Sequence, residues 1–168
     1  VKDAVDYPAW MYVYGARGSG AATFGFTPEL VTPLTATVRG TSSADFPKKC
    51  YNIKLADEEG RKRPQSLVGL PAHEKWALVA PWKFDPGIIN NSFVYSLSNS
   101  LGRWAPRTRF AEVFFNADGD DVTADDYAGL YVITDRVEVG PSRVSIAALT
   151  PGDGSGTALT GGYVFKID

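Results

Sequence analysis

Hydrogen-bond donors are concentrated in one stretch, RGTSSADFPKKCYNIKL, which runs from Arg39 to Leu55. An Arg-Gly pair, three hydroxyl side chains, a proline and two adjacent lysines precede an alternating apolar run. Arginine presents a planar fork of donors, lysine carries a compact charge, and glycine lets a ligand approach the backbone, which together suit phosphate oxygens. The candidate phosphate-binding residues are Arg39, Gly40, Ser42, Ser43, Lys48 and Lys49.

The two lysines stand at the start of a predicted strand, and period-two alternation assigns them to opposite faces of it. We therefore expect only one of them to face a given cleft, and the spacing does not decide which. A polar turn followed by a half-buried strand explains the same residues without a ligand, because lysine pairs are common on protein surfaces. The two faces contain Lys49, Tyr51, Ile53 and Leu55 on one side and Lys48, Cys50, Asn52 and Lys54 on the other.

The elements that position these residues are mainly strands. Alternation and β-branched or aromatic content predict strands over residues 10–15, 34–40, 50–55, 75–80, 111–116, 128–139 and 162–167. One helix is predicted at about residues 86–101, with Asp85 as the N-cap, Pro86 in the first turn and Gly102 just past the end. We expect an α+β fold, a mainly antiparallel twisted sheet with one principal helix.

That helix carries an apolar stripe, because large apolar residues recur every four positions along it. The stripe predicts that the helix packs on the sheet. Its members are Ile89, Phe93, Leu97 and Leu101.

The composition is that of a single globular domain. Hydrophobic residues make up 44% of the 168, charged residues 21%, and the 4 Trp, 8 Tyr and 9 Phe supply one large core. A net charge of −2 and a pI near 5.4 provide no broad field for nucleic acid or for an anionic membrane. No apolar run approaches the ~20 residues that span a bilayer, so no membrane span is expected.

Six segments in order, from about Val38 to Asp168, resemble the CotH family, the spore-coat-type atypical protein kinases. They are RGTSSADFPKKCYNIKL, LVGLPAHEKWALVAPWKFDPGIINNSFVYSLSNSLG, RFAEVFFN, YAGLYVITDRVEV, SRVSI and GGYVFKID. The most specific piece is the run Arg-Gly-x-Ser-Ser…Pro-Lys-Lys-x-Tyr. The resemblance implies the N-terminal part of an atypical protein-kinase-like fold.

The resemblance also implies an activity. Members of the family use ATP with Mg or Mn to phosphorylate Ser or Thr on coat or cell-surface proteins, which places the chain outside the cytoplasm. Lys48 or Lys49 resembles the strand lysine that neutralises nucleotide phosphates, a role that suits a transfer reaction governed by positioning and charge. The candidate carboxylate partners of that lysine are Glu112, Asp135 and Glu138.

This sequence departs from the family pattern in three respects. The family often has Glu where this chain has Asp135, and commonly Arg at Asn90; both changes shorten or remove a charged side chain. Its catalytic and metal-binding acidic motifs follow the GGYVFKID element. We therefore expect residues 1–168 to be a single domain, the N-terminal portion of a longer kinase-like domain. No catalytic residue or metal ligand is assigned, and whether the chain is itself an enzyme stays open.

Two other functional interpretations are kept. A noncatalytic cell-surface module that binds protein or glycan would retain the fold without the chemistry, and exposed tryptophans would supply a sugar-stacking platform. Burial in the core is the alternative use of those tryptophans. A structural fragment without independent activity is the third interpretation. The tryptophans are Trp10, Trp76, Trp82 and Trp104.

Three further motifs are interpreted structurally. The glycine-rich YGARGSGAATFGF precedes the lysines as a phosphate-covering loop would, but no helix follows it, so we interpret it as a hairpin turn with Arg17 in solvent. The acidic NADGDDVTADD lacks the glycine and glutamate of an EF-hand and is interpreted as a solvated insertion, with loose cation binding by its aspartates as the alternative. His73, the single histidine, is predicted to be an exposed turn residue. The aspartates are Asp118, Asp120 and Asp121.

Overall fold

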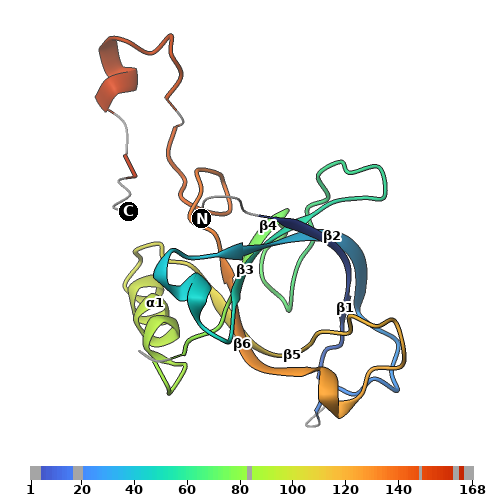
Figure 1. Cartoon of the computed structure of the whole chain (residues 1–168). Helices are drawn as coiled ribbons and strands as arrows, with labels where there is room; N and C mark the ends of the chain where they lie inside the picture. Colours follow the sequence, from blue (N-terminus) through green and yellow to red (C-terminus); the bar gives the residue numbers. More distant parts are fainter. Residues whose placement is uncertain (1–4, 17–20, 83–84, 148, 161–162, 165–168) are drawn as a thin grey trace.

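The computed structural model describes residues 5–16, 21–82, 85–147, 149–160 and 163–164. Within them the chain forms strands, one α-helix and short 3₁₀ turns (Figure 1). The strands are β1 (Asp6–Val13), β2 (Leu30–Arg39), β3 (Cys50–Leu55), β4 (Lys75–Val79), β5 (Thr108–Phe114) and β6 (Tyr127–Asp135). The helices are α1 (Asn90–Ser100) and the 3₁₀ turns η1 (Ser42–Asp45), η2 (Ala124–Asp126) and η3 (Gly156–Thr160).

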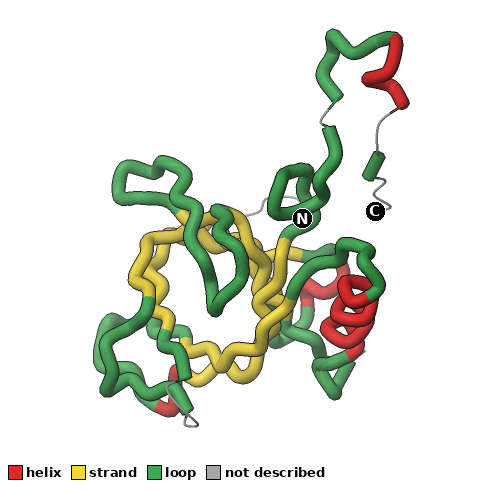
Figure 2. The backbone as a smooth tube through the Cα atoms, turned by 180° about the vertical axis from the view of Figure 1, so that it is seen from behind, coloured by secondary structure: helices red, strands yellow, loops and turns green. Residues whose placement is uncertain are grey.

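All six strands belong to one antiparallel sheet in the order β1-β2-β3-β4-β6-β5. The sheet curls so strongly that its first and last strands come round toward each other (Figure 2). Phe24, from the β1–β2 connection, meets the ring of Tyr14 at 5.3 Å and the ring of Phe114 on β5 at 4.9 Å. Aromatic contacts therefore link the two edges of the sheet. The predicted α+β class, a mostly antiparallel sheet with one helix, is confirmed.

The core lies on the concave face of the curled sheet. Alternation along β3 buries Ile53 and Leu55 and leaves Lys54 in solvent, as predicted from the sequence. Trp76 of β4 is fully buried between them and β6, so this tryptophan serves the core. Burial of side chains of this size contributes about 1.5–3 kcal/mol each. Trp10 and Trp82 are about half exposed.

Several predicted strand boundaries differ from the structure. β1, β2 and β5 each begin three or four residues earlier than predicted. β6 ends at Asp135, whereas the prediction extended to residue 139, because Asp135 enters a buried ion-pair network at that point. The predicted strand at 162–167 lies mostly outside the described residues.

Helix α1 begins four residues later than predicted. The Asp85 carboxylate accepts a hydrogen bond from the Asn90 backbone N–H at 3.2 Å, so it caps the helix across an intervening turn. Ile88 in that turn has φ +60°, which is incompatible with a helix running through it. At the other end, Gly102 adopts φ +75°, the left-handed conformation that terminates helices.

The prediction that the apolar stripe of α1 packs on the sheet is wrong. All four of its members are exposed, by 48% to 69%. The face turned inward instead carries Ser92, Tyr95 and Asn99, which are spaced three and four residues apart. The Asn99 side chain donates to the carbonyls of Tyr95 (2.9 Å) and Ala105 (3.0 Å) and accepts from the Ala105 N–H (3.0 Å). Ala105 is buried, so its backbone groups need these partners, and they orient the helix.

We expect Asn99→Ala to lower the free energy of unfolding by about 2–4 kcal/mol, because two backbone groups of Ala105 would lose their partners. Phe93→Ala on the exposed stripe should change it by no more than about 0.5 kcal/mol. Urea denaturation of both variants measures the difference. A loss of about 3–5 kcal/mol for Phe93→Ala, as for a core phenylalanine, would show that the stripe is packed after all.

Candidate functional site

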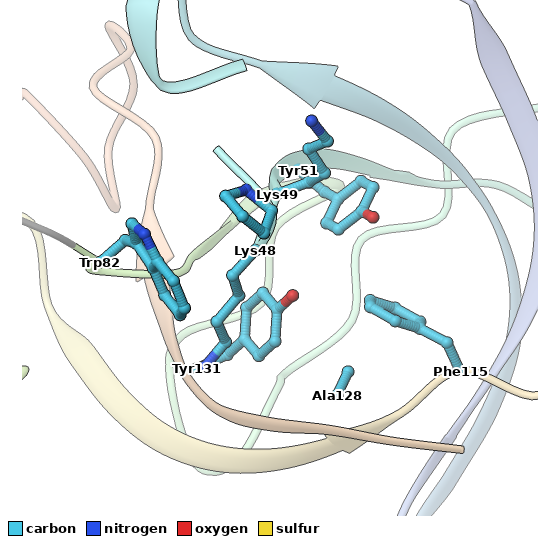
Figure 3. A pocket seen from close by; sticks show the side chains of 8 residues that line it. Lys48, Lys49, Tyr51, Trp82, Phe115, Ala128 and Tyr131 are labelled. Carbon is cyan, nitrogen blue, oxygen red and sulfur yellow. The ribbon is translucent and has the colours of Figure 1, made fainter. Parts of the chain in front are cut away.

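A cavity of about 340 Å³ lies between the start of β3 and the first half of β6 (Figure 3). Four of its eight lining residues are aromatic, and two lysines are its charged members. Its lining residues are Pro47, Lys48, Lys49, Tyr51, Trp82, Phe115, Ala128 and Tyr131.

Both lysines line this cavity, so the expectation that only one could do so is wrong. The reason is that β3 begins at Cys50, and the two lysines precede it in a bend where period-two alternation does not apply. Their side chains diverge from the shared backbone, with that of Lys48 running beside the ring of Tyr131 (Figure 3). The two ammonium groups therefore point in different directions.

Lys48 is held by β6. Its Nζ donates to the Leu130 carbonyl oxygen at 2.5 Å and lies 4.6 Å from the ring centroid of Tyr131. Burial lowers the pKa of Lys48 below its ordinary value, and the Cys50 thiol partly opposes that shift. An ammonium with one carbonyl acceptor keeps two further N–H donors, so Lys48 can still bind an anion.

Lys49 is held by the turn between β2 and β3. Its Nζ donates to the Ala44 carbonyl oxygen at 2.7 Å, in η1. Among the ion pairs of the described chain, neither lysine has a carboxylate partner. The two lysines that line the cavity thus carry positive charges that the described residues do not neutralise by direct contact.

The other four predicted residues lie at the end of β2 and in the β2–β3 turn, and they do not line the cavity. Arg39 ends β2, and Ser42 and Ser43 belong to η1. Gly40 has φ +105°, and a side chain there would overlap Ser43 Oγ, so the tight turn requires glycine. Phosphate binding by these four stays a prediction.

The three candidate carboxylate partners are engaged elsewhere. Asp135 is buried and pairs with Arg107, Nε to Oδ2 at 2.6 Å, and with the equally buried Arg143. Glu138 pairs with Lys75 at 2.8 Å. Glu112 accepts a hydrogen bond from the Tyr127 hydroxyl at 3.3 Å.

Sequence reasoning missed the two arginines that satisfy Asp135. Arg143 donates to the Lys75 carbonyl oxygen at 3.1 Å and lies 4.7 Å from the ring of Trp76. Burial first, and then the charge of Arg107, lowers the pKa of Arg143 to about 10. The sequence did contain a signal for this pairing: Arg143, within SRVSI, follows soon after the strand that ends in Asp135. A buried charge must be paired, so a nearby arginine was a candidate partner.

The prediction that His73 is an exposed turn residue is also wrong. Only 16% of its side-chain surface is exposed. Its Nδ1 accepts from the Lys75 N–H at 3.0 Å, and its carbonyl accepts from the Trp76 indole at 2.9 Å. Burial, followed by the nearby Arg143 charge, lowers the pKa of His73. It is part of the packing around the Asp135 network and not of the cavity.

The aromatic wall was likewise missed. The ring of Phe115 meets those of Tyr51 and Tyr131 edge-on, at 5.4 and 6.0 Å. Burial raises the pKa of Tyr51 and raises that of Tyr131 to about 12, so both phenols stay protonated at neutral pH and can donate hydrogen bonds. Tyr51 shares a strand face with the buried Ile53, which was the signal that its ring points inward.

Neither of the two remaining motifs supplies a described residue to this cavity. In the acidic insertion, Asp118 accepts from the Asp120 N–H and Asn116 from the Gly119 N–H, which is the hydrogen bonding of a turn. The glycine-rich turn lies partly outside the described residues, which omit Arg17, Gly18 and Gly20.

The described residues contain no group of three or more His, Cys, Asp or Glu that could hold a metal ion. The helices described are too short or too polar to cross a bilayer.

Comparison with known proteins gives one match. A family model described as CotH kinase protein matches residues 36–150. This is more than half of the chain and includes the whole lining of the cavity. No significant match was found among curated proteins or among solved structures.

We expect Asp135→Ala to destabilise the protein by about 3–5 kcal/mol, because Arg143 would stay buried without its counter-charge. Glu59→Ala, which removes a solvent-exposed partner of Arg61, is the control and should leave the urea midpoint nearly unchanged. Chemical denaturation compares the two. An Asp135→Ala protein with the stability of the Glu59→Ala protein would contradict the structural role given to this carboxylate.

Proposed function

The chain belongs to the CotH kinase protein family, and we propose that its cavity binds the phosphates of ATP. In this proposal the chain contributes to Ser or Thr phosphorylation of coat or cell-surface proteins outside the cytoplasm. ATP supplies the phosphoryl group, and the residues described above hold and orient it. The sheet with its single helix would then be the N-terminal part of a kinase-like fold.

The observation that carries the proposal is the pair of lysines without carboxylate partners. Each ammonium is hydrogen-bonded to a backbone carbonyl, at 2.5 Å for Lys48 and 2.7 Å for Lys49, and each keeps donors for a ligand. A cation in a partly desolvated cavity gains more from an anion than a cation in open water does. A polyphosphate would neutralise charges that the described residues leave unpaired, and its length suits ammonium groups that point in different directions.

The aromatic wall supports a ligand with a planar ring. Trp82 is about half exposed at the cavity, and Phe115 lies between the two tyrosines of the opposite wall. Bases stack on such rings for about 1–3 kcal/mol. A ligand with a ring at one end and phosphates at the other matches the aromatic and cationic parts of the lining.

Divalent metal fits these residues less well than phosphate does. The described part of the chain contains no cluster of three metal-ligating side chains, so Mg or Mn would have to arrive with the nucleotide. Ser42 and Ser43 belong to η1, whose Ala44 carbonyl accepts from Lys49, and Arg39 and Gly40 come just before η1 in the chain. We propose that they act as additional phosphate donors at the edge of the cavity.

We expect ATP, given with Mg or Mn, to bind the chain and to bind Lys48→Ala more weakly by about 10- to 150-fold, the value of a hydrogen bond to a charged group. Lys49→Ala should cost less, because its ammonium is held at the β2–β3 turn, away from the aromatic wall. Lys54→Ala, on the exposed face of β3, is the matched control and should bind as the parent does. Isothermal titration calorimetry at a fixed salt concentration measures all four affinities.

Two results would contradict the proposal. One is the absence of ATP binding to the parent chain with either metal. The other is equal loss of affinity in all three lysine variants, which would indicate a general charge effect and not a specific pocket. A glycan or protein ligand that still binds after both cavity lysines are replaced, in a chain that does not bind ATP, would favour a noncatalytic binding module.

A further inference from the structure

We propose that Gly129 is a positioning residue for Lys48: a glycine bulge in β6 leaves the space in which the lysine ammonium sits. The inference rests on the proposed function in that it concerns the same cavity, and it adds a residue that neither contacts the ligand nor belongs to the cavity lining. Its basis is the backbone of β6 and the space around one side chain.

The pairing of β5 with β6 is irregular at this point. Val113 pairs with Gly129, but the next residue, Phe114, pairs with Tyr127, so Ala128 is an extra residue on β6. Gly129 has φ +95°, the left-handed conformation that a glycine bulge requires. Bulges often occur next to functional sites, where they redirect side chains. Here the extra residue, Ala128, forms part of the cavity wall.

The bulge brings the β6 backbone close to Lys48. A Cβ atom on residue 129 would lie 3.1 Å from Lys48 Nζ and 3.7 Å from its Cε. The first of these distances is shorter than an ordinary contact, so a methyl group would make the ammonium shift from its position by a few tenths of an ångström.

Three consecutive residues of β6 thus form the binding position of the Lys48 ammonium group. Gly129 provides space, Leu130 provides the carbonyl acceptor at 2.5 Å, and Tyr131 provides the ring face at 4.6 Å. A lysine side chain is flexible, and fixing it before a ligand arrives reduces the entropy lost on binding. The bulge therefore acts on affinity through the geometry of Lys48.

Glycines elsewhere in the chain provide a matched control. Gly119 has φ +83°, close to that of Gly129, but a Cβ atom there would meet nothing within 4 Å. Alanine at Gly119 therefore tests the cost of a side chain in the left-handed region alone, whereas alanine at Gly129 adds the contact with Lys48. Comparison of the two separates backbone strain from displacement of the ammonium.

The first measurement needs no nucleotide. The pKa of Lys48 is followed by NMR in the whole chain with ¹³Cε-labelled lysine, and Lys48→Arg assigns the signal. In the parent this pKa should lie below the ordinary lysine value because of burial. In Gly129→Ala it should move back toward that value, because the displaced ammonium becomes more solvated. Gly119→Ala should leave it unchanged.

The second measurement is ATP affinity, with Mg, in a double-mutant cycle. Gly129→Ala should weaken binding about 3- to 10-fold, a fraction of the effect of removing Lys48. Combined with Lys48→Ala, it should add no further loss, because the group it positions is gone. Gly119→Ala should bind as the parent does.

The outcomes are distinguishable. If the parent does not bind ATP but Gly129→Ala shifts the Lys48 pKa, the proposed function fails and the positioning role stands. If the Lys48 pKa is the same in Gly129→Ala as in the parent, the positioning role is overturned whatever ATP does. Should Gly129→Ala not fold, Gly129→Asn decides in its place, since asparagine tolerates positive φ and carries the same Cβ.

Discussion

A carboxylate buried at the end of β6 must be neutralised without water, and this requirement fixes the segments around it. Asp135 is paired by Arg107, which immediately precedes β5, and by Arg143, eight residues further along the chain. Arg143 in turn donates to the backbone of β4 and lies against Trp76. Because removal of one partner would leave another charge buried, these contacts constrain two neighbouring strands and the segment that follows β6.

Strand β6 passes through two different electrostatic environments. Asp135 ends β6 four residues after Tyr131, roughly 13 Å along an extended chain. At the Asp135 end, acidic and basic side chains neutralise one another, as do Lys75 and Glu138 nearby. At the Tyr131 end, the cationic Lys48 contacts a carbonyl and an aromatic ring and has no carboxylate partner. Asp135 and Glu138 are thus paired with basic side chains away from the cavity, and the lysines of the cavity keep their positive charge.

The sequence predicts those features that depend on local patterns. Alternation along β3 identifies Ile53 and Leu55 as core residues, and the end signals around α1 locate that helix to within a few residues. The family was also recognisable, because its specific residues are contiguous around the two lysines. These inferences need only neighbours in the chain.

Two of the failures concern side-chain contacts that periodicity does not encode. The apolar stripe of α1 indicated an inward face, but Asn99 faces inward because it satisfies the buried backbone of Ala105. Asp135 looked like a partner for a lysine, but it pairs with arginines 28 and eight residues away. The assignment of the two lysines to opposite strand faces failed for a different reason: β3 begins only at Cys50, and period-two alternation does not apply before it.

The aromatic link between the edges of the sheet has a consequence for how the fold opens. Within the described chain β1 pairs only with β2, and β5 only with β6, so no backbone ladder joins the two outer strands. The rings of Phe24 and Phe114 bridge them instead. Contacts between rings tolerate small rotations that a hydrogen-bonded ladder would resist, so the volume of these side chains sets the diameter of the curled sheet. The sheet can therefore widen between β1 and β5 without any strand losing its pairing.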